Sequence, residues 1–176
     1  MSKTIRLTVL PIALALGASA HAEGMSGATG MAGMVGMAGT AEQPRYAKQK
    51  VVYHINYYGP KQQAAALRNI QNHINAVGAE DLDMKVVLHG NGVSLLMYPD
   101  ELEGTKMQEA NATDEMQARI AGLKQQGVAF NVCANTLKGR KVDTGALYDF
   151  GEADIVPSGV AELAQLQARG YTYITP

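Results

Sequence analysis

Residues 51–60 read VVYHINYYGP, and this stretch decides the fold because a strand pattern changes into a helix start within it. Its first part is rich in β-branched and aromatic side chains, which favours a strand over residues 51–56. Gly59 and Pro60 then open a helix, since proline is tolerated at the first helical position. Apolar side chains at helical spacing share one face until Gly78 ends the helix: Leu67, Ile70, Ile74 and Val77.

The same alternation of strand and helix continues to the end of the chain. Short apolar runs predict further strands at residues 84–89, 128–132, 155–156 and 171–175. Strands that alternate with helices imply right-handed crossovers and a mainly parallel sheet of about five strands, covered on both sides. The segments 91–112 and 139–153 are less regular, and their structure stays open.

Two of the predicted helices have clear ends and a clear inward face. The first begins at Thr113 and ends at Gly127, with an apolar face made of Met116, Ile120 and Leu123. The second follows Pro157 and ends at Gly170, and we expect its inward side chains to be Val160, Leu163 and Ala164.

The first residues have the pattern of a secretory signal peptide. Lys3 and Arg6 give a positive start, an apolar stretch too short to span a bilayer follows, and Ala20-His21-Ala22 suits cleavage after Ala22. The alternative is a retained membrane anchor, which Pro11 disfavours by interrupting the run. We therefore expect residues 1–22 to be removed and the mature protein to be periplasmic, with no later stretch apolar enough to span a membrane.

Residues 23–49 are rich in Gly, Ala and Met and lack any strand or helix period, which predicts a flexible linker. Four thioethers in this segment are ligands that suit Cu(I): Met25, Met31, Met34 and Met37. The plainer interpretation is a tether with incidental methionines, because no His or Cys accompanies them in the segment. Residues 50–176 then form one α/β domain.

Charge and motifs exclude several classes of protein. The net charge is −1, with 15 basic and 16 acidic residues scattered along the chain, so a nucleic-acid partner is not expected. The sequence holds no CxxC, HExxH, GxSxG or GxxxxGK[ST] motif. The histidines of the domain do not have zinc-site spacing either. We therefore predict neither a metal site nor a cofactor.

Ligands of open parallel sheets bind beyond the carboxyl ends of the strands, where loops from different strands meet. Polar and reactive side chains follow several predicted strands at these ends: Tyr57, His89, Asn91, Cys133, Asn135 and Ser158. For His89, a structural role and a hydrogen bond to the thiol are both open. His54 lies inside a strand, which favours a structural role.

Cys133 is the only cysteine of the chain, so it cannot form an internal disulfide and dithiol exchange within one chain is excluded. A helical turn directly after it, at residues 134–138, would favour the thiolate through its amide groups, as would the nearby cations Lys138, Arg140 and Lys141. The alternative is a small buried side chain that only packs.

Four segments carry a resemblance to a known family: VVYHIN with its following helix, KVVLHGNGVSLLM, FNVCANTL and VPSGVAELAQLQARGYTYITP. The sequence resembles the DsrE/DsrF-like family over residues 50–176, in a single-domain branch that often carries a signal peptide. The resemblance implies a flavodoxin-like three-layer sandwich, assembly as homotrimers or homohexamers, and a persulfide-bearing cysteine at Cys133.

The expected function is a periplasmic sulfur carrier or sulfurtransferase with Cys133 as nucleophile. Its donor would be polysulfide or thiosulfate, and its acceptor a thiol or protein that the sequence does not name. Possible pocket residues are His89, Asn91, Asn135, Tyr57 and Ser158. The alternative is a non-catalytic oligomeric binding module for a small ligand or metal ion.

Overall fold

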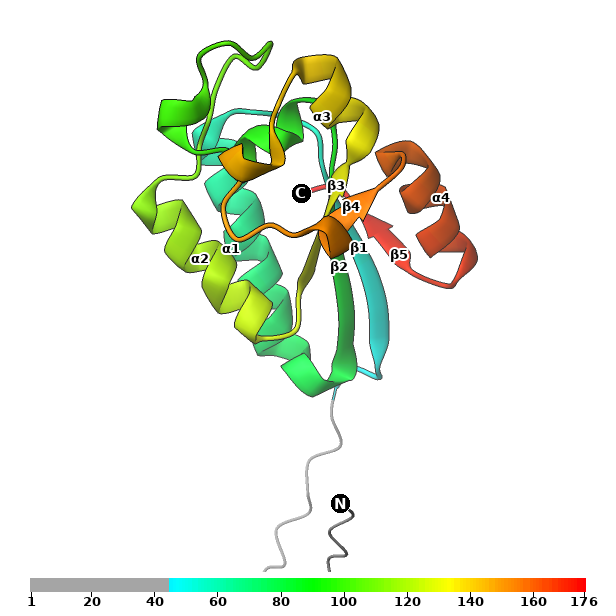
Figure 1. The fold of residues 1–176 in the computed structure, drawn as a ribbon. Coiled ribbons are helices and arrows are strands. Elements are labelled where there is room, and N and C mark those ends of the chain that lie inside the picture. The colour runs from blue at the N-terminus through cyan, green and yellow to red at the C-terminus, as the bar shows by residue number, and fades with distance from the viewer. Residues whose placement is uncertain (1–44) are drawn as a thin grey trace, which may run out of the picture. The chain divides into compact units, whose positions relative to one another are not determined.

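The computed structural model describes residues 45–176 (Figure 1). The predicted signal peptide and most of the predicted linker, including its four methionines, lie outside the described residues. Within the described part, no helix is both long and apolar enough to cross a membrane.

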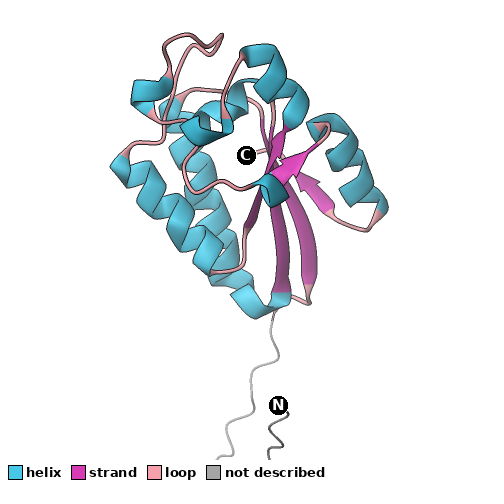
Figure 2. Cartoon of the chain, viewed as in Figure 1, coloured by secondary structure: helices cyan, strands magenta, loops and turns pink. Residues whose placement is uncertain are grey.

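The domain is built on a sheet of five parallel strands in the order β4-β3-β2-β1-β5 (Figure 2). The strands are β1 (Gln49–Ile55), β2 (Leu82–Leu88), β3 (Ala129–Cys133), β4 (Ile155–Val156) and β5 (Thr172–Ile174). Each predicted strand is present within about two residues of its expected ends, and the flavodoxin-like α/β class is confirmed. The α-helices of the described residues are α1 (Pro60–Val77), α2 (Asp114–Gln125), α3 (Ala134–Arg140) and α4 (Gly159–Ala168).

The strand order decides which helix covers which face. From β1 to β4 the chain moves steadily across the sheet, so right-handed crossovers put α1, α2 and α3 on one face. From β4 the chain returns past the whole sheet to β5, beside β1. The same handedness then puts α4 on the opposite face, as Figure 1 shows.

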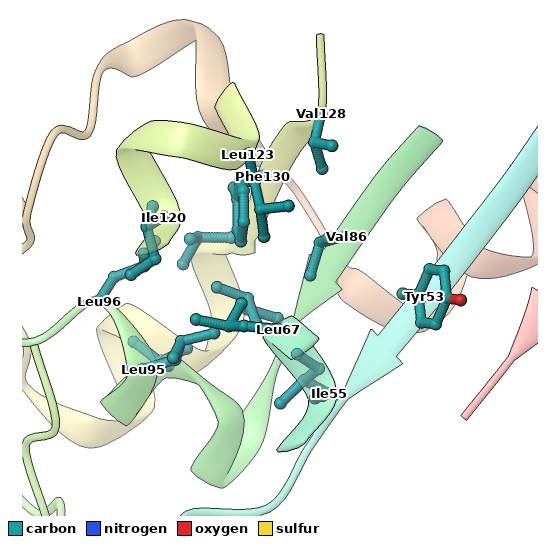
Figure 3. Close-up of a cluster of buried hydrophobic side chains, with 14 of the residues drawn as sticks. Tyr53, Ile55, Leu67, Val86, Leu95, Leu96, Ile120, Leu123, Val128 and Phe130 are labelled. Carbon is teal, nitrogen blue, oxygen red and sulfur yellow. The ribbon is translucent and has the colours of Figure 1, made fainter. Parts of the chain in front are cut away.

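The larger core lies between the sheet and the first three helices (Figure 3). The side chains of Ile55, Val86 and Phe130 point from neighbouring strands into this layer. The predicted inward face of α2 is confirmed, because Met116, Ile120 and Leu123 are all buried. The predicted helix from Pro60 is confirmed as well, and Gly78 follows its last residue with φ 99°, a conformation that favours glycine.

A smaller core lies under α4 on the other face: Val52, Val87, Leu163, Leu166 and Tyr171. Leu163 points inward as predicted, but the prediction for its neighbours is wrong, because Val160 is 66% exposed and Ala164 is exposed. The reason is that Gly159 is buried at the start of α4. The helix face toward the sheet therefore runs through Gly159, Leu163 and Leu166.

The two irregular segments form a cap of short 3-10 helices over the carboxyl ends of the strands. They are joined by an isolated antiparallel bridge between Met97 and Leu147. Below them, the fully buried Gln63 donates to Ser94 Oγ at 2.9 Å, and Asn111 Nδ2 donates to Gln63 Oε1 at 2.9 Å. The same two side chains donate to the carbonyls of Tyr57 and Tyr58, so this polar network holds the loop after β1 and the start of α1 against the segment after β2.

Candidate functional site

Cys133 is the last residue of β3 and the N-cap residue directly before α3. Because side chains alternate along a strand, Val132 points into the larger core and Cys133 points to the face covered by α4. Its side chain is 5% exposed. The thiol thus lies at the carboxyl edge of the sheet, where ligands of such sheets bind.

Opposing effects act on the ionisation of this thiol. Burial alone would raise the pKa of Cys133, but hydrogen-bond donors near the sulfur outweigh it and leave the pKa below its ordinary value; they are the Gly159 amide, the Thr136 hydroxyl and amide, and the Asn135 amide. These donors therefore make the thiolate easier to form than in a free cysteine.

Gly159 brings three parts of the site together. A Cβ atom at this position would stand 2.8 Å from Cβ of His89 and 3.2 Å from Cβ of Cys133. Only a residue without a side chain lets the start of α4 approach both residues so closely. Sequence reasoning pointed to the neighbouring Ser158 and missed Gly159; a glycine directly after a helix-capping serine was the available signal.

Thr136 was also missed. Its hydroxyl oxygen accepts a hydrogen bond from the backbone N–H of Gly90 at 2.9 Å, which ties the loop after β2 to the helix after β3. The signal in the sequence was its position three residues after Cys133, where a side chain on the first turn of a helix turns back toward the residue that begins it.

His89 and His54 form a stacked pair beside the thiol, with ring centroids 4.6 Å apart and an interplanar angle of 29°. His54 is only 8% exposed; its Nδ1 lies 2.7 Å from the hydroxyl of Tyr173, and its Nε2 is buried with no hydrogen-bond partner among the described residues. Burial lowers the pKa of both histidines, and the neighbouring His89 lowers that of His54 further. The pair is therefore neutral at pH 7, and the Cys133 thiolate is favoured by hydrogen bonds instead of by an imidazolium.

This pair makes the protein sensitive to acid. The pKa values of His54, His73 and His89 lie below the ordinary 6.5 in the folded state, so the unfolded chain binds more protons than the folded one once the pH falls below 6.5. We expect the free energy of unfolding to decrease from there down to the folded-state pKa values, measured by urea denaturation above and below pH 6.5. His54→Gln should weaken that pH dependence. Equal stability of the wild-type protein on both sides of pH 6.5 would contradict the expected acid sensitivity.

The other predicted pocket side chains are engaged elsewhere. Asn91 accepts a hydrogen bond from Arg140 at 3.1 Å, and the Tyr57 hydroxyl donates to the carbonyl of Pro176 at 3.3 Å. Ser158 caps α4 by accepting from the amide of Ala161 at 3.4 Å. Asn135 has an exposed side chain, and it reaches the sulfur only through its backbone amide. Of the predicted side chains, the structure thus brings His89 to Cys133.

The predicted cations do not surround the sulfur. The second guanidinium nitrogen of Arg140 donates to the carbonyl of Lys106 at 3.1 Å, and Lys138 is exposed on the same helix. None of the influences that lower the pKa of Cys133 is a charge. In residues 45–176, no three His, Cys, Asp or Glu side chains gather in a way that could hold a metal ion.

The fold and this edge define an α/β protein with one ionisable thiol at the carboxyl end of a central parallel strand. The chain belongs to the DsrE/DsrF-like family, whose model matches residues 50–176. No curated protein matches the sequence.

Several solved structures are similar to this chain. One similar structure is a protein of unknown function, MTH1491 from Methanobacterium thermoautotrophicum, with 26% identity and a TM-score of 0.57 over 73% of this chain and 99% of that chain. Another is the ychN protein from E. coli, with 22% identity and a TM-score of 0.49 over 74% of this chain and 100% of that chain.

Proposed function

We propose that this protein is a periplasmic sulfur carrier or sulfurtransferase that holds sulfane sulfur as a persulfide on Cys133. The observation that carries the proposal is the position of the chain's only cysteine, which lies at the carboxyl end of β3, directly before α3 and against the start of α4. A carrier needs one thiol only, because it accepts a sulfur atom from one molecule and passes it to another.

The chemistry balances with either donor. The Cys133 thiolate attacks the sulfane sulfur of thiosulfate; a new S–S bond forms, the old one breaks, and sulfite leaves with its electron pair. With a polysulfide, the thiolate attacks the outer sulfur and a polysulfide shorter by one sulfur atom leaves. An external thiolate then attacks the outer sulfur of the persulfide, and Cys133 departs as a thiolate ready for another cycle.

The partners of this cycle are part of the proposal. The acceptor is a small thiol or a second protein, since the chain has no other cysteine. Family membership supports a homotrimer or homohexamer, and the leader pattern at residues 1–22 supports a periplasmic location.

A non-catalytic binding module is the second candidate, and two observations favour it. Cys133 is 5% exposed, as a thiol that only packs would be. A groove of about 310 Å³ also lies between α1 and α2, with Leu67 and Leu123 among its apolar residues and Arg68 and Arg119 among its polar ones. Such a groove suits a small ligand with an apolar body.

Intact-mass analysis separates the two candidates. After treatment with polysulfide or thiosulfate, the native protein should gain the mass of one or more sulfur atoms, a reductant should remove it, and peptide mapping should place it on Cys133. Cys133→Ser is the matched control, and it should keep the fold and lose the gain. If the folded wild-type protein takes up no sulfur from either donor, the binding module becomes the better explanation.

A further inference from the structure

We infer that the groove between α1 and α2 is a second binding site, which takes a small organic anion with an apolar body, such as a medium-chain carboxylate. The two helices lie side by side on one face of the sheet, and the groove between them has a volume of about 310 Å³ (Figure 1). Cys133 points to the opposite face of the sheet, under α4. Binding in the groove therefore does not depend on sulfur transfer, and it goes beyond the proposed function.

The shape of the groove follows from the residues that the two helices turn toward each other. Each helix contributes side chains at the spacing i, i+1, i+4 and i+5: Leu67, Arg68, Gln71 and Asn72 from α1, and Ala118, Arg119, Gly122 and Leu123 from α2. A Cβ atom at Gly122 would meet nothing within 4 Å, so the space beside α2 is open there. Ligand pockets range from about 300 to 1,000 Å³, which makes this one suitable for a small ligand.

The floor of the groove is apolar, and its width is fixed before a ligand enters. Leu67 and Leu123 are each 2% exposed and belong to the larger core. Gln71 and Gln126 donate to each other's side-chain oxygens at 2.9 and 2.8 Å, which joins α1 to the end of α2. An apolar ligand chain that covers the floor would leave water without any movement of the helices.

The charged side chains of the lining decide the class of ligand. Arg68 and Arg119 line the groove, and none of the described lining residues is acidic. Arg119 is paired with Glu115 at 2.7 Å, one turn earlier on α2. Within residues 45–176, Arg68 takes part in no ion pair. One uncompensated guanidinium beside an apolar floor favours a ligand with a single negative charge, and a carboxylate matches its planar fork of donors.

Calorimetric titration of the folded protein with octanoate tests this site, with octan-1-ol as the uncharged comparison. We expect octanoate to bind once per chain and more tightly than octanol. Arg68→Gln should weaken octanoate binding by about two- to fivefold, as expected for an ion pair at a largely exposed position, and should leave octanol binding unchanged. The difference between the two ligands should shrink at high salt, because salt screens exposed charges.

A blocking variant locates the site. Gly122→Leu puts a branched side chain into the groove and should abolish octanoate binding. Gly139→Leu is the matched control, because Gly139 lies in α3, away from the groove, and a Cβ atom there also meets nothing within 4 Å. Circular dichroism checks that both variants fold. Should Gly122→Leu not fold, Arg68→Gln and the comparison with octanol decide the result.

Several outcomes would overturn the inference. Octanoate could fail to bind the folded wild-type protein, octanol could bind as tightly as octanoate, or octanoate binding could persist in folded Gly122→Leu. A smaller oligomer of Gly122→Leu in light scattering would show instead that a second copy of the chain covers the groove. Cys133→Ser should bind octanoate as the wild type does. A wild-type protein that takes up no sulfur but binds octanoate would therefore contradict the proposed function and support the groove as a binding site.

Discussion

Gly92→Ala is expected to destabilise the protein by about 3 kcal/mol or more, because overpacking a rigid backbone contact is among the costly substitutions. A Cβ atom at position 92 would stand 1.9 Å from the carbonyl oxygen of Ile55 and 2.6 Å from its carbonyl carbon. Both are backbone atoms at the end of β1, which pairs with β2 on one side and β5 on the other. Neither can move aside as the tip of a flexible side chain could.

Urea denaturation measures this effect, and Gly122→Ala is the matched control. Gly122 lies in α2, where an added Cβ meets nothing within 4 Å, so alanine should raise the free energy of unfolding by about 0.5–1 kcal/mol through its better helix propensity. The two substitutions add the same methyl group and should have effects of opposite sign. A Gly92→Ala variant as stable as the wild type would show that the loop after β2 is free to shift.

The predictable part of this fold rests on local signals. Pro60 and Gly78 mark the ends of α1 within the chain itself, and apolar side chains between them repeat at helical spacing. Thr113 likewise accepts a hydrogen bond from the amide of Met116, as a helix-capping residue should. Such signals depend on neighbours in the sequence, so they can be found before any tertiary contact is known.

The inward face of α4 could not be predicted in the same way. Val160 is apolar and stands at helical spacing with Ala164, so a face through both was reasonable. The actual face is set by the contact of Gly159 with His89, which directly follows β2, and with Cys133, which ends β3. A glycine carries no hydropathy signal, and its close approach to distant residues is visible only in the folded protein.

The location of the candidate site could be predicted from the sequence, but most of the side chains that form it could not. Strand ends identified the edge on which Cys133 and His89 lie. Tyr57 and Asn91 also follow strand ends, but their polar atoms are engaged by residues 119 and 49 positions away. Two of the groups that favour the thiolate are backbone amides of Asn135 and Gly159, whose direction depends on helix geometry and not on residue type.

Gly159→Ala tests whether the approach of α4 to Cys133 controls both stability and ionisation. On helix propensity alone, alanine at the first position of an exposed helix should be neutral or stabilising. The contacts of 2.8 Å to Cβ of His89 and 3.2 Å to Cβ of Cys133 predict the opposite, a loss of about 1–3 kcal/mol in the free energy of unfolding. The start of α4 must move away from the sheet, and the amide that it directs at the sulfur moves with it.

The second effect of this substitution is on the thiol. The Gly159 amide is the first among the hydrogen bonds that lower the pKa of Cys133, so its withdrawal should raise that pKa and move the midpoint of the alkylation profile to higher pH. Val160→Ala is the control, because that side chain is 66% exposed in the same helical turn and should change neither property. If Gly159→Ala destabilises the fold while the midpoint stays, then the amides of α3 and the hydroxyl of Thr136 are sufficient to favour the thiolate, and α4 only covers the site. If the midpoint moves as well, then α4, in the connection from β4 to β5, contributes directly to the chemistry of Cys133. The reason would be that the start of α4 brings a backbone donor to the sulfur from the second face of the sheet.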